Sequence, residues 1–158
     1  MRLLEGTVAV DDVDAFVARL DEVGAETDAT VQAFDARYVV SERHLARAVD
    51  LADRAIARGE NIARDRAVEI LLYAAARRQI SAALELGVAE GSNRVVVLVD
   101  GGDEAAAADA LRADVLGTVE PTLGGYDSER VRSYFDVGDA DLDVVDGDLE
   151  ALVLERVA

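Results

Sequence analysis

The sequence predicts a single α/β domain (mixed α+β) spanning residues 1–158, in which a mixed sheet of about four strands packs against helices. A chain of 158 residues suits one domain with one core. Segments of strand character lie between segments of helical periodicity, which is typical of α/β or α+β chains. The run VVVLV at residues 95–99 is apolar on both faces and therefore predicts a central strand.

The first half of the chain predicts two extended segments and two helices. Apolar residues alternate loosely in the first strand, and an aspartate or serine cap precedes each helix while a glycine ends it. In order, the expected elements are a strand at 3–10, a helix at 12–24, an extended segment at 31–40 with a break near 35–36, and a helix at 41–59.

The second half begins with the stretch EILLYAAARRQISAAL, which lies within the most apolar helical segment of the chain. Residues 68–86 are apolar nearly all round the first two turns, so they predict a buried helix that ends at Gly87. The remaining expected elements are a strand at 94–100, a helix at 103–111, a strand at 115–119, a short helix at 128–134 and a final helix at 148–157.

The composition argues against several classes of protein. The absence of cysteine excludes disulfides and thiolate metal sites, and a single histidine, His44, does not favour zinc. No stretch approaches the roughly 20 apolar residues of a membrane span, and the opening residues lack the pattern of a signal peptide. We therefore expect a cytoplasmic protein without a metal or cofactor and without a membrane partner.

The charge of the chain is strongly acidic. The net charge is −17, and all 16 basic residues are arginine. This combination indicates adaptation to a salt-rich cytoplasm and predicts a halophilic archaeon as the source. Acidic surfaces keep proteins hydrated and soluble, so the charge describes the solvent first and does not exclude nucleic acid as a partner.

Basic residues are concentrated in one part of this acidic chain. Residues 37–78, which we call the basic segment, contain nine arginines against six acidic residues. One interpretation is a solvated face with helical ion pairs, such as Asp50 with Arg54 and Glu60 with Arg64. The other is an anion-binding surface, because guanidinium groups bind phosphate oxygens in a bidentate manner. The spacing of the arginines does not decide between the two.

Two titratable residues inside apolar patterns have a structural and a functional interpretation. Glu69 lies on the apolar face of its helix, where a carboxylate needs a partner, and a structural pair with an arginine is favoured over a catalytic base. His44 has no second histidine and no nucleophile near it in the sequence. We therefore predict no catalytic residues.

Two further motifs are weak. The segment VVVLVDGGDEA resembles the start of a phosphate-binding turn, but Gly101 and Gly102 belong to neither the dinucleotide fingerprint nor the P-loop. Residues 139–150 place acids at several positions of a calcium loop but have Val144 where that loop requires glycine. The first motif favours a tight turn and the second does not favour calcium.

Two stretches carry a resemblance to a known family, namely VQAFDARYVVSERHLARAVDLADRAI (31–56) and ENIARDRAVEILLYAAARRQISAALELGV (60–88). They resemble the small regulatory subunit of the KEOPS complex, the PRPK-binding protein family. The resemblance implies a noncatalytic subunit of the assembly that installs threonylcarbamoyladenosine in tRNA. Such a subunit binds and stimulates a small atypical kinase, contacts the threonylcarbamoyl transferase subunit indirectly, and captures the 3′ CCA end of tRNA.

The resemblance also assigns roles to residues. Arg77, Arg78 and Gln79 match the R-Q-I segment of the family. Together with Arg64 and Arg66, which the anion-binding interpretation of the basic segment adds, they are the expected tRNA contacts. Relatives often have Ser-Gly or a proline before that segment, whereas this chain has three alanines, which favour continuing the helix. A nucleotide-binding enzyme that uses the Gly101-Gly102 turn and a kinase regulator without tRNA contact are the alternative functions.

The final helix is the predicted kinase interface. Leu149, Leu152, Val153 and Val157 form an apolar stripe, and Leu154 lies off this stripe. In a lone domain the stripe faces the core, so Leu154 and its neighbours are expected to present surplus apolar surface to the kinase.

Overall fold

The computed structural model describes residues 1–158 and contains one four-stranded sheet. The strands are β1 (Arg2–Val10), β2 (Thr30–Asp35), β3 (Gly91–Asp100) and β4 (Thr118–Val119). Their order in the sheet is β2-β3-β1-β4, so the apolar run 95–99 lies in an interior strand, as predicted. Every pair of neighbouring strands is antiparallel. The α/β class and the strand number are confirmed, whereas the prediction that the sheet is mixed in direction is wrong.

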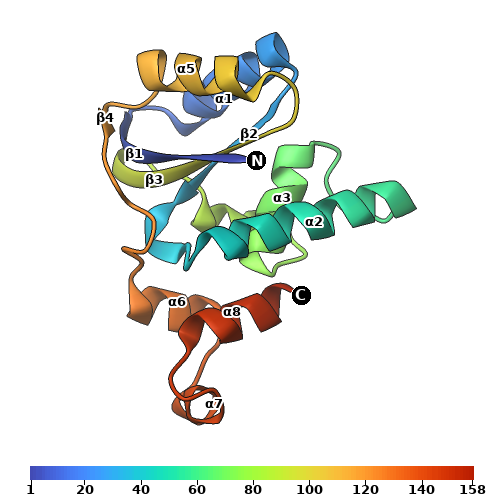
Figure 1. Cartoon of the computed structure of the whole chain (residues 1–158), viewed down its shortest axis with the longest axis vertical. Helices are drawn as coiled ribbons and strands as arrows, with labels where there is room; N and C mark the ends of the chain where they lie inside the picture. Colours follow the sequence, from blue (N-terminus) through green and yellow to red (C-terminus); the bar gives the residue numbers. More distant parts are fainter.

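Helices cover both faces of this sheet (Figure 1). The helices are α1 (Val13–Thr27), α2 (Glu42–Arg58), α3 (Arg66–Ala75), α4 (Ile80–Ala83), α5 (Glu104–Asp114), α6 (Ser128–Tyr134), α7 (Asp139–Val144) and α8 (Leu149–Val157), with 3₁₀ turns η1 (Ala36–Tyr38) and η2 (Leu84–Leu86). Helices α1 and α5 lie on one face, and α2 and α3 lie on the other. Helices α6 and α8 form a further layer beyond α2, and α7 lies at the end of the molecule.

The apolar strand β3 divides the core into two clusters. Val95, Val97 and Val99 join the cluster beneath α1 and α5. Val96 and Leu98 point to the opposite face and join the larger cluster with α2, α3, α6 and α8. Because side chains alternate along a strand, a run that is apolar at every position is buried on both faces.

The predicted helix starts are confirmed by their caps. The side chain of Asp12 accepts a hydrogen bond from the backbone N–H of Ala15, and Ser41 accepts one from that of His44. Helix α2 ends at Gly59, which has a left-handed backbone with φ 70°. Helix α1 extends beyond the predicted end at Gly24 and ends at Thr27.

The structure also changes other predicted elements. The strand expected at 115–119 is only the two residues of β4, because α5 continues to Asp114. Residues 68–86 do not form one helix, because α3 ends at Ala75 and two short turns follow. The segment 139–150, whose acids match several positions of a calcium loop, is helical at its start: its first six residues are α7, and Asp139 pairs with Arg132. No group of three or more acidic or histidine side chains is arranged to hold a metal ion.

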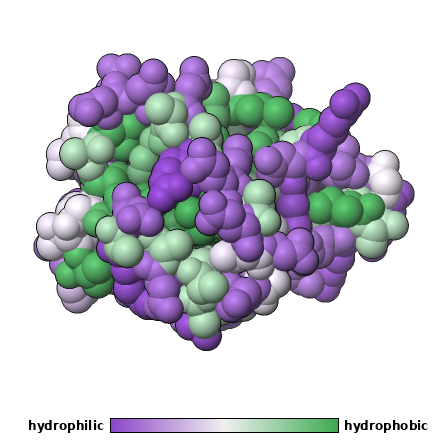
Figure 2. Space-filling view, turned by 90° about the horizontal axis from the view of Figure 1, so that it is seen from above, coloured by the Kyte–Doolittle hydropathy of each residue, from purple (hydrophilic) through white to green (hydrophobic).

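The face of the molecule above α1 and α5 carries both hydrophilic and apolar residues (Figure 2). On the face above α1 and α5, apolar residues form separate patches among hydrophilic ones (Figure 2). No helix in the structure combines the length and the apolar character that a bilayer span requires.

Candidate functional site

The turn between α3 and α4 carries three of the five residues predicted to contact RNA. Helix α3 ends in a Schellman arrangement, in which Ala76 has a left-handed backbone with φ 53°. The N–H of Ala76 bonds the carbonyl of Tyr73, and the N–H of Arg77 bonds that of Leu72, each at 3.0 Å. The helix therefore continues through Ala74 and Ala75 but stops at Ala76, and Arg77, Arg78 and Gln79 lie beyond its end in a turn.

The side chain of Arg77 is half-buried and connects the end of α3 to α6. Its guanidinium donates a hydrogen bond to the backbone carbonyl of Tyr134 on α6 and lies over the Tyr134 ring, 4.1 Å from the centroid. The hydroxyl of Tyr134 in turn donates to the carbonyl of Ala82 at 2.7 Å. Arg77 therefore joins the end of α3 to α6, and its two terminal guanidinium nitrogens donate to the carbonyl groups of Ala75 and Tyr134.

Arg78 and Gln79, which follow Arg77 in the turn, are exposed. Neither side chain has an ion pair or a hydrogen bond within the chain. Arg78 borders a small hollow of about 60 Å³, which is also lined by Ile62 and Tyr73. Ile62 is 49% exposed, so an unpaired cation and an apolar side chain adjoin the same hollow.

Glu69 fixes the segment that carries Ile62. The carboxylate is almost fully buried and accepts hydrogen bonds from the N–H of Ile62 at 3.1 Å and of Ala63 at 2.9 Å. The prediction that Glu69 pairs with an arginine is wrong, because the hydrogen bonds to its carboxylate come from backbone N–H groups. These bonds hold residues 60–65 against α3, next to Arg78.

Arg66 lies at the other end of α3. The helix has ten residues, which at 1.5 Å per residue separates its ends by about 15 Å. Arg66 donates to Asp53 at 2.8 Å and to Asp100 at 2.7 Å, and its pKa is raised, first by the hydrogen bond to Asp53. The structure therefore places Arg66 in an internal ion network, away from Arg78.

Of the two ion pairs predicted within the basic segment, one forms and the other does not. Asp50 and Arg54 form the predicted helical ion pair at 3.0 Å. Arg64 is exposed and makes no ion pair, so the predicted Glu60–Arg64 pair is wrong; Glu60 follows the end of α2 rather than lying in a shared helix. Arg64 remains an accessible cation on the segment that Glu69 holds.

His44 is a buried structural residue. Its Nδ1 accepts a hydrogen bond from the N–H of Val40, and its Nε2 lies 2.8 Å from the carbonyl of Ala74, which can only accept. The ring is therefore the neutral Nε2–H tautomer. Burial lowers the pKa of His44. His44 joins α2 to the last turn of α3, close to the turn that carries Arg78.

The Gly101-Gly102 turn is occupied by the chain itself. The N–H of Gly101 donates to the Glu104 carboxylate at 2.8 Å, and the amino group of Met1 pairs with Asp100 and Glu104. Gly102 has φ 55°, and a Cβ there would lie 2.2 Å from the Asp28 carbonyl oxygen. Carboxylates stand where a phosphate would have to bind, so the geometry is that of a tight turn.

The predicted kinase-binding residues on α8 are buried. Leu149, Leu152 and Val153 belong to the larger core cluster. The prediction that Leu154 presents surplus apolar surface is wrong, because Leu154 is only 8% exposed. The exposed apolar residue near this helix is Val144 at the end of α7, which is 84% exposed.

Sequence reasoning missed three residues that shape these surfaces. Tyr134 positions Arg77, Ile62 lies beside Arg78, and Val144 is the most exposed large apolar side chain. Only Val144 had a signal in the sequence, since it lies in an acidic segment with few apolar residues to pack against. The other two residues come near the arginine turn only through tertiary packing, Tyr134 from α6 and Ile62 from the loop before α3.

A comparison with protein families gives one match over most of the chain. The family model described as Kinase binding protein CGI-121 matches residues 10–158. The matched range includes α2, α3, the Arg77–Gln79 turn and the C-terminal helices. No curated protein matches the chain.

Proposed function

Because this chain belongs to the CGI-121 family of kinase binding proteins, we propose that it is a noncatalytic regulatory subunit that binds a small atypical kinase and recruits tRNA through its 3′ CCA end. The sequence resemblance to the KEOPS subunit supports a place in the assembly that makes threonylcarbamoyladenosine. In that assembly the chain stimulates the kinase and contacts the transferase subunit indirectly.

The observation that carries the RNA proposal is the unpaired Arg78 in a chain with net charge −17. Acidic residues outnumber basic ones twofold, so an exposed arginine without an ion pair is available to an external anion. Arg78 shares its surroundings with Ile62 and half-buried Tyr73. A cation beside apolar and aromatic side chains suits single-stranded RNA, whose phosphates need charge and whose unstacked bases need apolar contact.

Within this surface the residues have different roles. Arg78 binds a phosphate of the CCA tail, and Gln79 donates to or accepts from the edge of a splayed base. Arg77 is a positioning residue, because its guanidinium holds the turn against Tyr134. Arg64 supplies a further cation on the segment fixed by Glu69. Arg66 is not part of this surface, because its guanidinium is paired with Asp53 and Asp100 at the far end of α3.

The test is tRNA binding measured by fluorescence anisotropy in about 1 M potassium chloride, where the screening length is only about 3 Å. Arg78→Ala removes a charge-assisted contact of about 1.5 to 3 kcal/mol and should weaken binding at least tenfold. The matched control is Arg58→Ala, since Arg58 is also exposed and unpaired but ends α2. Its effect should stay within twofold.

Two outcomes would contradict the RNA proposal. In the first, tRNA that lacks the CCA end binds as well as intact tRNA. In the second, Arg58→Ala and Arg78→Ala weaken binding equally, which would assign the effect to net charge. Kinase binding that persists without any tRNA binding would support the kinase regulator without tRNA contact.

For the kinase we propose a surface on α7 and α8 centred on Val144. Helices α7 and α8 pack together. Leu149, Leu152, Val153 and Leu154 are buried, so the most accessible large apolar side chain of this layer is Val144. Val144→Asp should abolish capture of the purified kinase without altering the unfolding midpoint. Val119→Asp is the matched control, because Val119 is 62% exposed on β4 and lies in another part of the fold. Equal loss in both variants would place the interface elsewhere.

A further inference from the structure

A groove runs between α1 and α3 along the free edge of β2. Two neighbouring hollows of about 250 and 380 Å³ make up this groove and share Leu20 of α1. Thr30 and Val31 of β2 line the larger hollow, and Gln32 and Ala33 line the smaller one, so the strand forms the floor while α1 and α3 form the walls. None of the predicted RNA contacts except Arg66 lines it.

The first hollow is apolar. Phe16 and Val17 of α1 face Val68 and Leu71 of α3 across it. Val17 is 44% exposed and Leu84 of η2 is 57% exposed, and both line this hollow. Exposed apolar side chains gathered around a concave apolar surface are typical of a binding groove.

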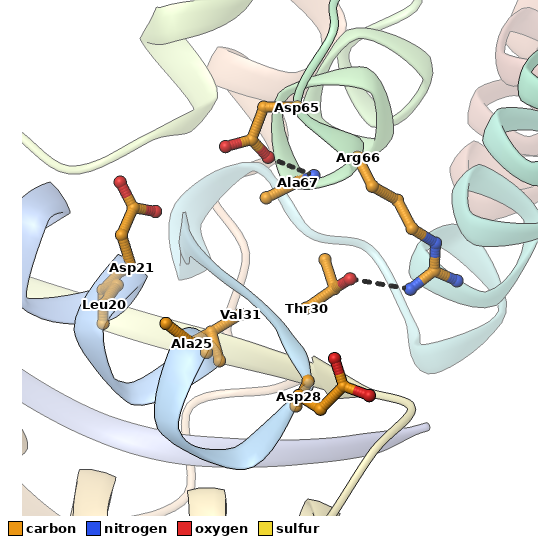
Figure 3. A pocket seen from close by; sticks show the side chains of 11 residues that line it. Leu20, Asp21, Ala25, Asp28, Thr30, Val31, Asp65, Arg66 and Ala67 are labelled. Atoms are coloured by element: carbon orange, nitrogen blue, oxygen red, sulfur yellow. Dashed lines mark hydrogen bonds between the residues drawn. The ribbon is translucent and has the colours of Figure 1, made fainter.

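The second hollow is acidic. Asp21 of α1, Asp28 after α1 and Asp65 at the start of α3 line it, and none of the three forms an ion pair. In Figure 3, Asp21 and Asp65 extend from α1 and from the start of α3 towards the same space. The pKa of Asp21 is raised by burial and by the charge of Asp65. Arg66 does not neutralise these groups, because it bonds Asp53, Asp100 and Thr30.

The floor of the groove offers backbone hydrogen-bonding groups. Strand β2 pairs only with β3, so its other edge is free. No residue from Thr30 to Asp35 makes a backbone hydrogen bond outside the sheet. Alternate N–H and C=O groups of an edge strand therefore point into the groove, where an added strand can pair with them.

We propose that this groove binds an extended segment of a partner protein as an added strand along β2, with apolar side chains in the first hollow and a lysine or arginine between Asp21 and Asp65. This interaction is additional to the kinase and RNA surfaces and rests on neither. Charge complementarity identifies the partner chemistry: three unpaired carboxylates repel phosphates, whereas a cationic side chain relieves the repulsion between Asp21 and Asp65.

The test begins with a selection of random seven-residue peptides against the full chain in about 0.5 M potassium chloride. We expect enriched peptides to combine alternating apolar residues with a terminal lysine or arginine. Binding of a synthetic enriched peptide is then measured on three variants. Asp21→Asn with Asp65→Asn removes both charges and keeps an N-cap for α3, and Val17→Glu obstructs the apolar hollow. Each should weaken binding at least tenfold.

The third variant is the matched control, Asp109→Asn with Asp143→Asn. It removes two exposed carboxylates outside the groove and should change the affinity less than twofold. Two further versions of the peptide carry N-methyl groups on alternate residues, one on the odd-numbered and one on the even-numbered positions. One of these two versions should bind at least tenfold more weakly than the unmethylated peptide, because N-methylation removes the N–H groups that would pair with β2. The proposal is overturned if no peptide is enriched or if the control variant weakens binding as much as the groove variants. It is also overturned if neither methylated version loses affinity, or if a single-stranded RNA displaces the peptide.

Discussion

Replacing Arg77 with alanine should destabilise the fold, although Arg77 lies in the predicted RNA surface. The change removes the hydrogen bond from the guanidinium to the Tyr134 carbonyl, and bonds that involve a charged group contribute about 1.5 to 3 kcal/mol. It also removes the cation–π contact at 4.1 Å, which contributes about 0.5 to 1 kcal/mol. Because Arg77 is half-buried and partly screened, we expect the free energy of unfolding to fall by about 2 to 3 kcal/mol in urea denaturation.

Arg78→Ala is the internal control for this prediction. Arg78 follows Arg77 in the same turn and carries the same charge, but its side chain has no partner in the fold, so the loss should stay within about 0.5 kcal/mol. A double-mutant cycle of Arg77→Ala with Tyr134→Leu should give a coupling of about 0.5 to 1 kcal/mol. The reasoning is refuted if Arg77→Ala costs less than 1 kcal/mol or if both arginine variants lose the same stability.

Three further perturbations test the surroundings of this turn. Glu69→Ala leaves the N–H groups of Ile62 and Ala63 without their carboxylate and should lower the free energy of unfolding by about 3 kcal/mol in urea; a loss below 1 kcal/mol would contradict the role of Glu69. Ala76→Gly removes the left-handed strain of a Cβ and should raise stability by about 0.5 to 1 kcal/mol, visible as a higher thermal midpoint; a lower midpoint would argue against the φ of 53°. His44 has a pKa below its unfolded value, so its contribution is present above about pH 6.5 and declines as the pH falls below it. Denaturation at pH 7 and pH 5.5 should show that decline relative to His44→Gln, and parallel pH profiles of the two proteins would refute it.

The sequence predicts the elements of this fold better than their arrangement. Strand β3 and the start of α2 follow from local signals, an apolar run and a serine cap. The antiparallel order of the strands does not follow from local signals, because β1 pairs with a strand about 90 residues further along the chain. Pairing over such separations depends on burial that no local pattern records.

The break in the helix after α3 shows the same limit. Helix propensity favours continuing through Ala74, Ala75 and Ala76, but propensity is weak compared with tertiary contacts. The turn places Arg77 against Tyr134, 57 residues away, and lets His44 bond the carbonyl of Ala74. The basic segment correctly marked a region with accessible cations, yet only the structure shows that Arg66 is paired with Asp53 and Asp100.

The placement of charges on α3 allows surfaces of opposite sign to operate in one small domain. The acidic hollow adjoins the start of α3, and Arg78 follows its end. A separation of about 15 Å exceeds the screening length of about 8 Å at physiological ionic strength, and in stronger salt the difference grows. Asp21 and Asp65 therefore scarcely weaken the attraction of Arg78 for an anion. If RNA and peptide both bind, each should leave the affinity for the other unchanged within about twofold, whereas strong mutual exclusion would mean that the two surfaces overlap.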